Sequence, residues 1–477
     1  MAVGSGMRRS GCAAVFVTLA FAGGAAADDA TFGDERTVPS HLDHGAIARG
    51  EIPAADLLAH GRELFEARFT SLDGAGRPRA SAADVPTHRP GDVVPAFLRT
   101  SGPDASACSG CHSQPVTGGA GDFAVNVFVA PQDIEYDFDS LAPELSMERG
   151  TTHLMGGGLL ELVAREMTAD LQGLRDRAAA EARSSTEPVR VRLVTKGVDF
   201  GWLEAAPDGT LNASGIQGVH PDLIVRPFSQ KAVVISLRQF TVNALNTHHG
   251  MQAEERFGTR WTDEADFDGD GHEAELSEGD VTALTLFQAA LPPPAQMPPE
   301  DKTTRAAAAE GERLFAATGC TSCHVPALPL ESAVFAEPGP YNPAGTLRAQ
   351  EAPAVGLDLG ALFGPLLRRD AEGRVLVPAF TDLKRNVIAD RRTPHFANEK
   401  LTHNFVTREQ FRTAPLWGVA STAPYGHRGD LTTLTEAILA HGGEATASRD
   451  AFVALDELDR RRVIAFLQTL CLPEALP

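Results

Sequence analysis

The chain has 477 residues, of which 43% are hydrophobic and 22% are charged, and its formal net charge is −21 at pH 7. This composition is typical of a globular protein with room for more than one hydrophobic core, and it excludes a disordered, collagen-like or coiled-coil chain. The negative charge disfavours nucleic acid and anionic membranes, so we expect neither as a partner.

The N-terminus has the order of a secretory signal peptide. Arg8 and Arg9 precede a short apolar run, which is followed by small residues up to Ala27. The run is too short to span a membrane, so the pattern predicts a signal peptide over 1–27. We expect cleavage after Ala27, a periplasmic location, and no membrane span in the mature protein.

The first chemically specific motif follows a short predicted helix. That helix carries the pentapeptide 61–65 (GRELF), and the motif is Cys108-Ser-Gly-Cys111-His112. C-x-x-C-H is the attachment signature of a c-type haem, in which both cysteines form thioethers and the histidine binds the iron. A zinc site or a thioredoxin-like pair would not require histidine directly after the second cysteine.

The middle of the chain combines a long helix, short strands and a histidine pair. Periodicity predicts a helix over 158–183 and β-hairpin segments over 189–195 and 232–236. On the helix, Glu161 is a candidate proton donor. The candidate ligands or distal residues of the first haem are His248, His249 and Met251, unless this loop only contacts a propionate. Trp261 is a candidate for electron transfer between haems, with simple packing as the alternative.

An acidic loop follows this segment. Asp266, Asp268 and Asp270 are spaced like the start of an EF-hand loop and are followed by Gly271, but the twelfth position is Ser277. Calcium held by these aspartates would therefore need Glu278 or Asp280 to close a longer loop. The alternative is a solvated acidic turn.

A second copy of the motif lies beyond a proline-rich boundary. The boundary at 291–299 predicts modules over 28–300 and 301–477. In the second module, a predicted helix over 303–318 carries the pentapeptide 311–315 (GERLF) and leads into Cys320-Thr-Ser-Cys323-His324. We therefore expect two covalently bound haem c groups and an internal repeat.

A matching spacing extends the repeat downstream. Leu237 precedes His248 by eleven residues, and Leu416 precedes His427 by the same number, so His427 is included among the haem-site candidates. A helix predicted from Leu434 to residue 441 places His441 on its apolar stripe, where either a haem iron or a core hydrogen-bond partner would satisfy the ring.

The predicted elements favour a mainly α fold. Helices over 158–183 and 455–470 give the clearest patterns, and 331–353 has the composition of a long loop. We expect two cytochrome c-like haem modules with long loops and minor β-hairpins.

The stretch 413–429 (TAPLWGVASTAPYGHRG) resembles a segment of bacterial di-haem cytochrome c peroxidases and the related tryptophylquinone-forming di-haem enzymes. In those families the distal ligand of the C-terminal haem lies fourteen residues beyond the position of His427, and here that residue is His441. The chain is more similar still to the exported di-haem oxidoreductases sometimes labelled thiol oxidoreductases, through 101–104, 158–161, 441–445 and the final helix. The resemblance implies a bis-histidine, low-spin second haem.

One expected peroxidase feature is missing. Peroxidases of this type carry a distal histidine shortly after the first motif, but 113–132 contains none. Direct transfer of their distal-pocket residues to this chain is therefore not supported.

Together these features predict a periplasmic di-haem oxidoreductase that resembles peroxidases. Electrons from a periplasmic donor, such as a small cytochrome or a cupredoxin, would enter at the second haem. Hydrogen peroxide would be reduced at the first, with His248, His249 and Glu161 as candidate catalytic residues. The alternatives are a non-catalytic di-haem electron-transfer protein and a di-haem enzyme that oxidises another protein's side chain.

Overall fold

The computed structural model describes residues 34–81, 83, 85–88, 106–121, 124–128, 146–400 and 402–476. The expected signal peptide over 1–27 and the segment 101–104 lie outside these residues. No helix among the described residues is long and apolar enough to cross a membrane.

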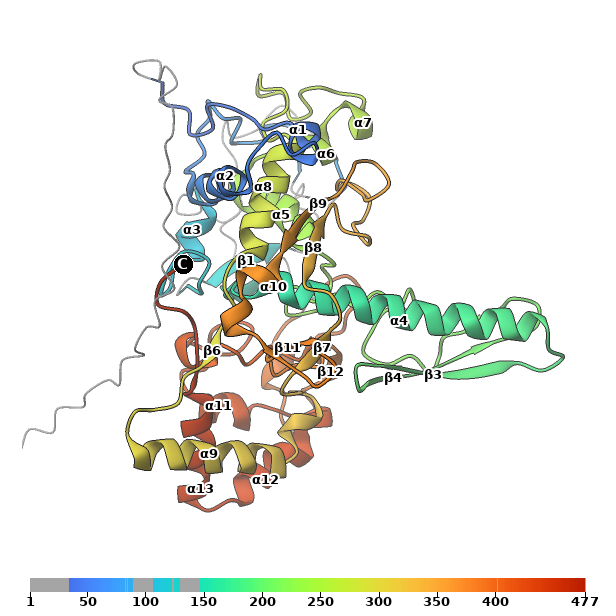
Figure 1. Cartoon of the computed structure of the whole chain (residues 1–477), viewed down its shortest axis with the longest axis vertical. Coiled ribbons are helices and arrows are strands. Elements are labelled where there is room, and N and C mark those ends of the chain that lie inside the picture. Colours follow the sequence, from blue (N-terminus) through green and yellow to red (C-terminus); the bar gives the residue numbers. More distant parts are fainter. Residues whose placement is uncertain are drawn as a thin grey trace, which may run out of the picture.

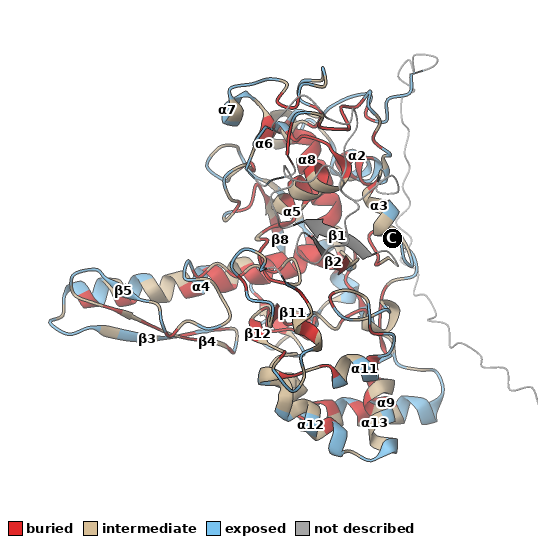
Figure 2. Ribbon diagram, turned by 180° about the vertical axis from the view of Figure 1, so that it is seen from behind, coloured by how far each residue is buried: buried red, intermediate tan, exposed pale blue. Residues whose placement is uncertain are grey.

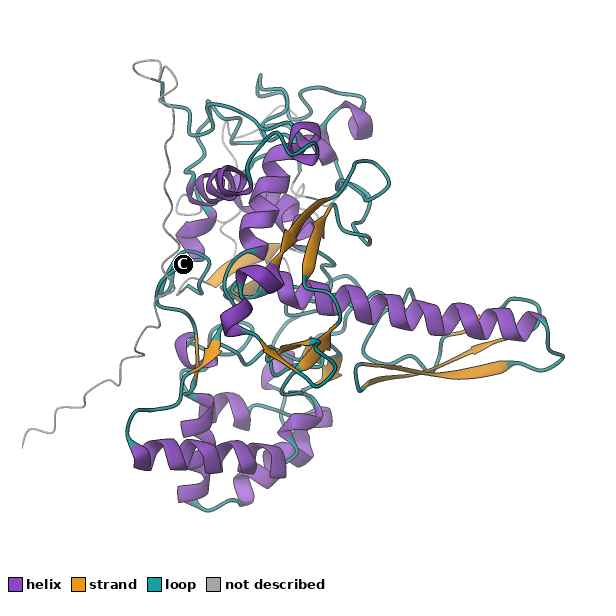
Figure 3. Ribbon diagram, in the orientation of Figure 1, coloured by secondary structure: helices purple, strands orange, loops and turns teal. Residues whose placement is uncertain are grey.

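The described residues form a mixed α and β structure, with 36% helix and 15% strand, so the expectation of a mainly α fold of cytochrome c-like modules is wrong (Figure 3). Among the described residues, the strands form six sheets of two or three strands each. Most of these strands have two to five residues and carry almost no periodic signal, and several of them pair with strands that are distant in sequence. The segment 331–353, expected to be a loop, contains the strand β8 (Val334–Glu337), which pairs with β9 (Val355–Asp358).

Each copy of the internal repeat contains one pair of packed helices. The first pair is α2 (Ala54–Glu66) on α8 (Glu278–Ala289), and the second is α9 (Lys302–Ala317) on α13 (Glu457–Leu467) (Figure 1). Phe65 packs against Phe287 and Phe315 against Phe466 with tilted rings, whose centroids are 5.4 Å apart in both pairs. The predicted helix over 303–318 is therefore confirmed to within one residue at each end.

Glycine allows the close approach of the helices in each pair. A Cβ on Gly61 would lie 2.2 Å from the Ala283 carbonyl oxygen, and one on Gly311 would lie 1.8 Å from that of Arg462. Both contacts are with backbone, which cannot rotate away. The two GxxLF segments noticed in the sequence thus occupy equivalent places in two equivalent helix pairs.

A long arm projects from the body of the molecule. It is formed by α4 (Gly157–Arg183) with β3 (Val189–Thr195), β4 (Val198–Ala205) and β5 (Leu211–Asn212) alongside (Figure 1). The half of α4 nearer the body is buried and its far half is largely exposed (Figure 2). The predicted helix over 158–183 and strand over 189–195 are confirmed, whereas 232–236 contributes only a single bridge.

The two halves of the chain share their largest hydrophobic core. It includes Leu159 and Leu286 from before the proline-rich segment, and Leu328 and Trp417 from after it. Within that segment, β6 (Ala295–Gln296) pairs with β14 (Leu470–Cys471) near the C-terminus. This shared core includes residues of α2 and α8, whereas α9 and α13 pack around a separate cluster that includes Phe315 and Phe466.

Shorter elements complete the fold. In the first half of the chain they are α1 (His44–Ala48), α3 (Cys108–Cys111), β1 (Ala124–Phe128), β2 (Ser146–Gly150), α5 (Leu237–Ala244), the π-helical turn η1 (Leu245–His249), α6 (Glu254–Phe257) and α7 (Thr259–Thr262). In the second half they are η2 (Cys320–Ser322), β7 (Leu328–Leu330), α10 (Leu359–Leu362), η3 (Gly364–Leu366), β10 (Arg368–Arg369), β11 (Val375–Val377), β12 (Arg385–Val387), η4 (His395–Ala397), β13 (Gln410–Arg412), η5 (Val419–Ser421), α11 (Leu434–Leu439), η6 (Gly443–Ala445) and α12 (Thr446–Ala454).

Candidate functional site

Both C-x-x-C-H motifs line a single cavity of about 1050 Å³. Ligand pockets commonly occupy roughly 300–1,000 Å³, so this one is large. The motif residues in its wall are Cys108, Cys111, His112, Cys320, Cys323 and His324. Four further histidines that the sequence singled out also line it, namely His248, His249, His427 and His441.

In the C-terminal half, two imidazoles are held in the same way. His324, directly after η2, donates from Nδ1 to the Phe380 carbonyl at 3.1 Å, and His441, just beyond α11, donates from Nδ1 to the Ala437 carbonyl at 2.7 Å. Such a bond at Nδ1 leaves Nε2 as the unprotonated nitrogen of a neutral ring. Burial, and secondarily the proximity of His441, lowers the pKa of His324 to about 4, so this ring is neutral at pH 7.

Local packing fixes the positions of these two rings. Phe315 from α9 lies 6.2 Å from His324, and Phe396 lies edge-on to His441 at 5.4 Å. A capping box between Thr433 and Glu436 starts α11. That helix ends two residues before His441, earlier than the sequence predicted, and the histidine follows in the turn.

The N-terminal half repeats part of this arrangement. Phe65 lies 6.3 Å from His112, as Phe315 does from His324. Across the cavity wall, His248 and His249 end the π-helical turn η1, and His249 Nε2 lies 3.5 Å from Cys108 Sγ. Burial, followed by the neighbouring His249 and His112, lowers the pKa of His248 to about 3. The predicted histidine pair therefore reaches the first motif.

Three other candidates do not line the cavity. Met251 is fully buried in the hydrophobic core. Trp261 is 37% exposed on α7, beside Arg260 and Arg348. Glu161 is buried in α4, where it accepts hydrogen bonds from Arg165 and from the start of α5.

The carboxylate of Glu161 is bonded to its surroundings at both oxygens. Oε2 accepts from the Leu237 amide at 2.7 Å, at the start of α5, and Oε1 accepts from Arg165 Nη2 at 2.6 Å. Burial raises its pKa and the Arg165 charge opposes that shift. Glu161 therefore fixes the helix that leads to His248.

Several residues of the cavity wall were not among the candidates named from the sequence. Trp417 is buried, and its carbonyl accepts from His153 Nε2 at 3.1 Å. Arg412 is partly buried and donates from Nε to the Ser229 carbonyl at 3.2 Å. Trp417 and Arg412 lie in or beside the stretch 413–429, whereas nothing in the sequence pointed to His153.

A charged cluster surrounds His427 on the same wall. Its Nε2 lies 3.2 Å from Glu399 Oε1, and its ring lies 4.7 Å from that of Phe411. Glu399 also pairs with Arg149 at 3.0 Å and with the buried Lys231 at 3.6 Å. His427, which is neutral because burial lowers its pKa, thus lies at the cavity beside ion pairs of Glu399, and Arg149 and Lys231 could not have been predicted from local patterns.

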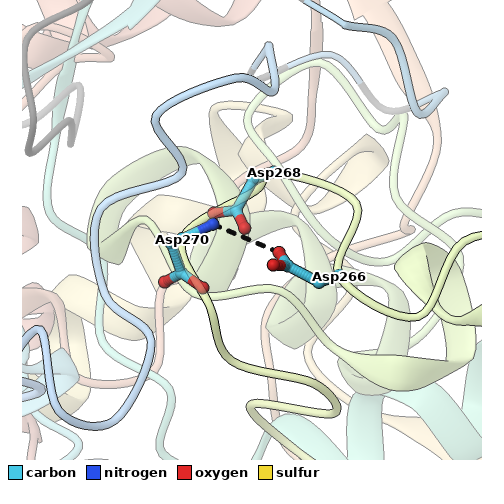
Figure 4. Close-up of side chains that lie close together, drawn as sticks. All are labelled: Asp266, Asp268 and Asp270. Carbon is cyan, nitrogen blue, oxygen red and sulfur yellow. Dashed lines mark hydrogen bonds between the residues drawn. The ribbon is translucent and has the colours of Figure 1, made fainter.

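The acidic loop lies apart from the cavity lining. The carboxylates of Asp266, Asp268 and Asp270 come within 4.8 Å of one another (Figure 4). Asp280 instead caps α8 with Ser277, and Glu278 pairs with Arg260 at 3.1 Å. The structure therefore gives both residues expected to close a calcium loop other partners.

The donor set of the cavity fits c-type haem. Each half offers two free thiols and an imidazole, which is what covalent attachment and axial ligation require. In the described part of the chain, the motif thiols and imidazoles do not gather into a group with metal-ligand spacing, as a zinc site would need.

Comparison with known proteins supports the same chemistry. The model of a family described as "Di-haem oxidoreductase, putative peroxidase" matches residues 397–470, a segment that includes His427 and His441. No curated protein matches the chain. The C-terminal part of the chain is thus similar to di-haem oxidoreductases.

Proposed function

We propose that the chain is a periplasmic di-haem c-type oxidoreductase that reduces hydrogen peroxide. The observation that carries the proposal is the single cavity lined by both C-x-x-C-H motifs. The family match over 397–470 supports a peroxidase-like oxidoreductase, and the order of residues 1–27 supports export.

Each half of the cavity would hold one haem. Cys108 and Cys111 would form the thioethers of the first, with His112 as axial ligand. Cys320, Cys323 and His324 would do the same for the second. When bound, the haems supply one-electron transfer and the reduction of peroxide.

The C-terminal half is suited to electron entry. The Nδ1 bonds of His324 and His441 fix the tautomer of each ring and leave Nε2 able to bind a metal. Two imidazole ligands would leave no coordination position for a substrate. The net charge of −21 favours a donor with a basic docking face, such as a small cytochrome or a cupredoxin.

The N-terminal half is suited to proton handling. Reduction of one hydrogen peroxide to two waters consumes two electrons and two protons, and a proton must move between the two oxygens. His248 lines the cavity, and burial lowers its pKa to about 3, so its ring is neutral at pH 7 and carries one nitrogen with a free lone pair. His249, whose Nε2 lies beside the Cys108 sulfur, is a second imidazole in this half of the cavity.

Steady-state peroxide consumption by the haem-loaded protein tests the proposal, with a reduced small cytochrome as donor. We expect His248→Ala to lower kcat by about 10²-fold or more, since general acid–base groups contribute roughly 10²–10⁴-fold. Trp261→Phe, on exposed α7, is the matched control and should retain wild-type turnover. An active His248→Ala enzyme would refute this role, and a wild-type protein that exchanges electrons with the donor but leaves peroxide intact would identify an electron carrier.

A further inference from the structure

The acidic loop before α8 brings three carboxylates close together around a sharp turn. Asp266, Asp268 and Asp270 alternate along the chain, so their carboxylates converge to within 4.8 Å (Figure 4). Gly271, at the sixth position, has a φ of +97°, which suits the sharp turn that calcium-binding loops make there.

Asp268 is the central group of this loop. The residue is 0% exposed, and neither of its carboxylate oxygens has a hydrogen-bond partner among the described residues. A buried carboxylate without a partner costs several kcal/mol, so it either takes up a proton or binds a cation. Burial, followed by the charges of Asp270 and Asp266, raises its pKa to about 8.

A fourth carboxylate, which the sequence did not single out, lies near this loop but outside the group of three. Glu275 is 5% exposed, and its Oε2 accepts from the Gln252 amide at 2.7 Å. Burial raises its pKa, and the charges of Asp268, Asp270 and Asp266 raise it further, so a cation bound at the loop would also attract this carboxylate.

The protein supplies little positive charge to balance this cluster. Within the described ranges, no lysine or arginine forms an ion pair with any of the four carboxylates. Arg79 reaches the loop through its backbone amide, which donates to the Asp268 carbonyl at 2.9 Å, and its side chain covers Gly269. His272 lies beside Asp270.

We propose that Asp266, Asp268, Asp270 and Glu275 bind one calcium ion. All four donors are carboxylates, and a ligand set made only of oxygen suits Ca²⁺, which takes 6–8 oxygen ligands, with backbone and water completing the shell. Zinc and copper prefer nitrogen and sulfur. Glu275 closes the loop in place of the expected Glu278 or Asp280. The proposal is independent of the haem function proposed above.

The ion would tie this loop to the segment that carries the cavity histidines. Gln252, held by Glu275, lies three residues after His249, and the Gly250 carbonyl accepts from the Gly76 amide at 2.9 Å. A cation that fixes Glu275 would therefore also fix η1. Calcium removal should increase hydrogen–deuterium exchange in the segment 245–252.

Isothermal titration of the chelator-stripped, haem-loaded full chain with calcium chloride tests the site. We expect one calcium per chain and a rise of roughly 3–6 °C in melting temperature at saturation. Asp268→Asn and Glu275→Gln should each weaken binding at least tenfold. Glu278→Gln, whose parent side chain pairs with Arg260, is the matched control and should bind normally.

Three results would overturn the proposal. The first is a wild-type protein that binds no calcium, which needs no variant to fold. The second is unchanged affinity in Asp268→Asn. The third is loss of binding in Glu278→Gln with retention in Glu275→Gln, which would restore the longer loop. Haem absorption and circular dichroism of each variant establish that it is folded.

Discussion

Replacing Gly311 by alanine tests the packing that supports the second haem motif. The new Cβ would lie 1.8 Å from the Arg462 carbonyl oxygen, 2.4 Å from its carbon and 3.0 Å from the Val463 nitrogen. Ordinary contact begins near 3.4 Å. Because all three atoms belong to the backbone of α13, α9 must move away by about 1.5 Å, and overpacking of this kind typically costs about 1–3 kcal/mol.

The gain in helix propensity offsets part of that cost. Alanine is better than glycine in a helix interior by about 1 kcal/mol. We therefore expect a net loss of up to about 2 kcal/mol, or up to roughly 8 °C in melting temperature. The contacts of Phe315 with Phe466 and with His324 should loosen at the same time, which a change in the haem absorption spectrum would report.

Thermal melts of the haem-loaded protein measure this effect against a matched control. Gly173→Ala introduces the same methyl group on α4, where the nearest atom is Arg177 Nη1 at 3.3 Å, at the end of a flexible side chain. That variant should be as stable as the wild type or more stable. Equal stability of Gly311→Ala and Gly173→Ala would refute the close helix pair.

Two further substitutions test other assignments. Burial acts to raise the pKa of Asp280, but hydrogen bonds from His41 and His60 outweigh it and hold that pKa well below 3.8. A carboxylate whose pKa is lowered by folding adds stability above about pH 4, and this stability is lost as the pH falls further. The difference in melting temperature between wild type and Asp280→Asn should therefore be several degrees at pH 6 and should shrink towards pH 3. A difference that stays constant with pH would refute the ionic contribution. Glu161→Gln should destabilise the protein by about 1–3 kcal/mol through the Arg165 pair. Peroxide turnover should stay within twofold, because the glutamine oxygen can still accept from the Leu237 amide and hold α5; a folded variant with tenfold lower kcat would return Glu161 to the proton path.

The parts of the site that the sequence could predict are those defined by local patterns. Histidine directly after a second cysteine is a signal contained in five residues, and the two motifs do line one cavity. Helical periodicity over 158–183 and 303–318 is long enough to locate α4 and α9. Position within the repeat singled out His248 and His427, and helical periodicity singled out His441; all three line the cavity.

The rest depends on contacts between distant residues. Glu161 and Trp261 were candidates because of their residue types, but their roles are decided by which neighbours the fold supplies. Glu275 was missed because its burial beside Asp268 comes from tertiary packing, not spacing. The sheets were underestimated for the same reason, since a strand as short as β6 is defined only by its pairing with β14.

Low-temperature EPR of the oxidised, haem-loaded protein and of its His441→Ala variant tests the central claim most directly. The account predicts a low-spin signal from the haem at Cys320 and Cys323 that becomes high-spin in the variant, and a second, high-spin signal, in the oxidised or half-reduced protein, that changes on addition of peroxide. A low-spin signal unaffected by His441→Ala would contradict the bis-histidine assignment. Two low-spin irons indifferent to peroxide in both redox states would contradict the peroxidase function.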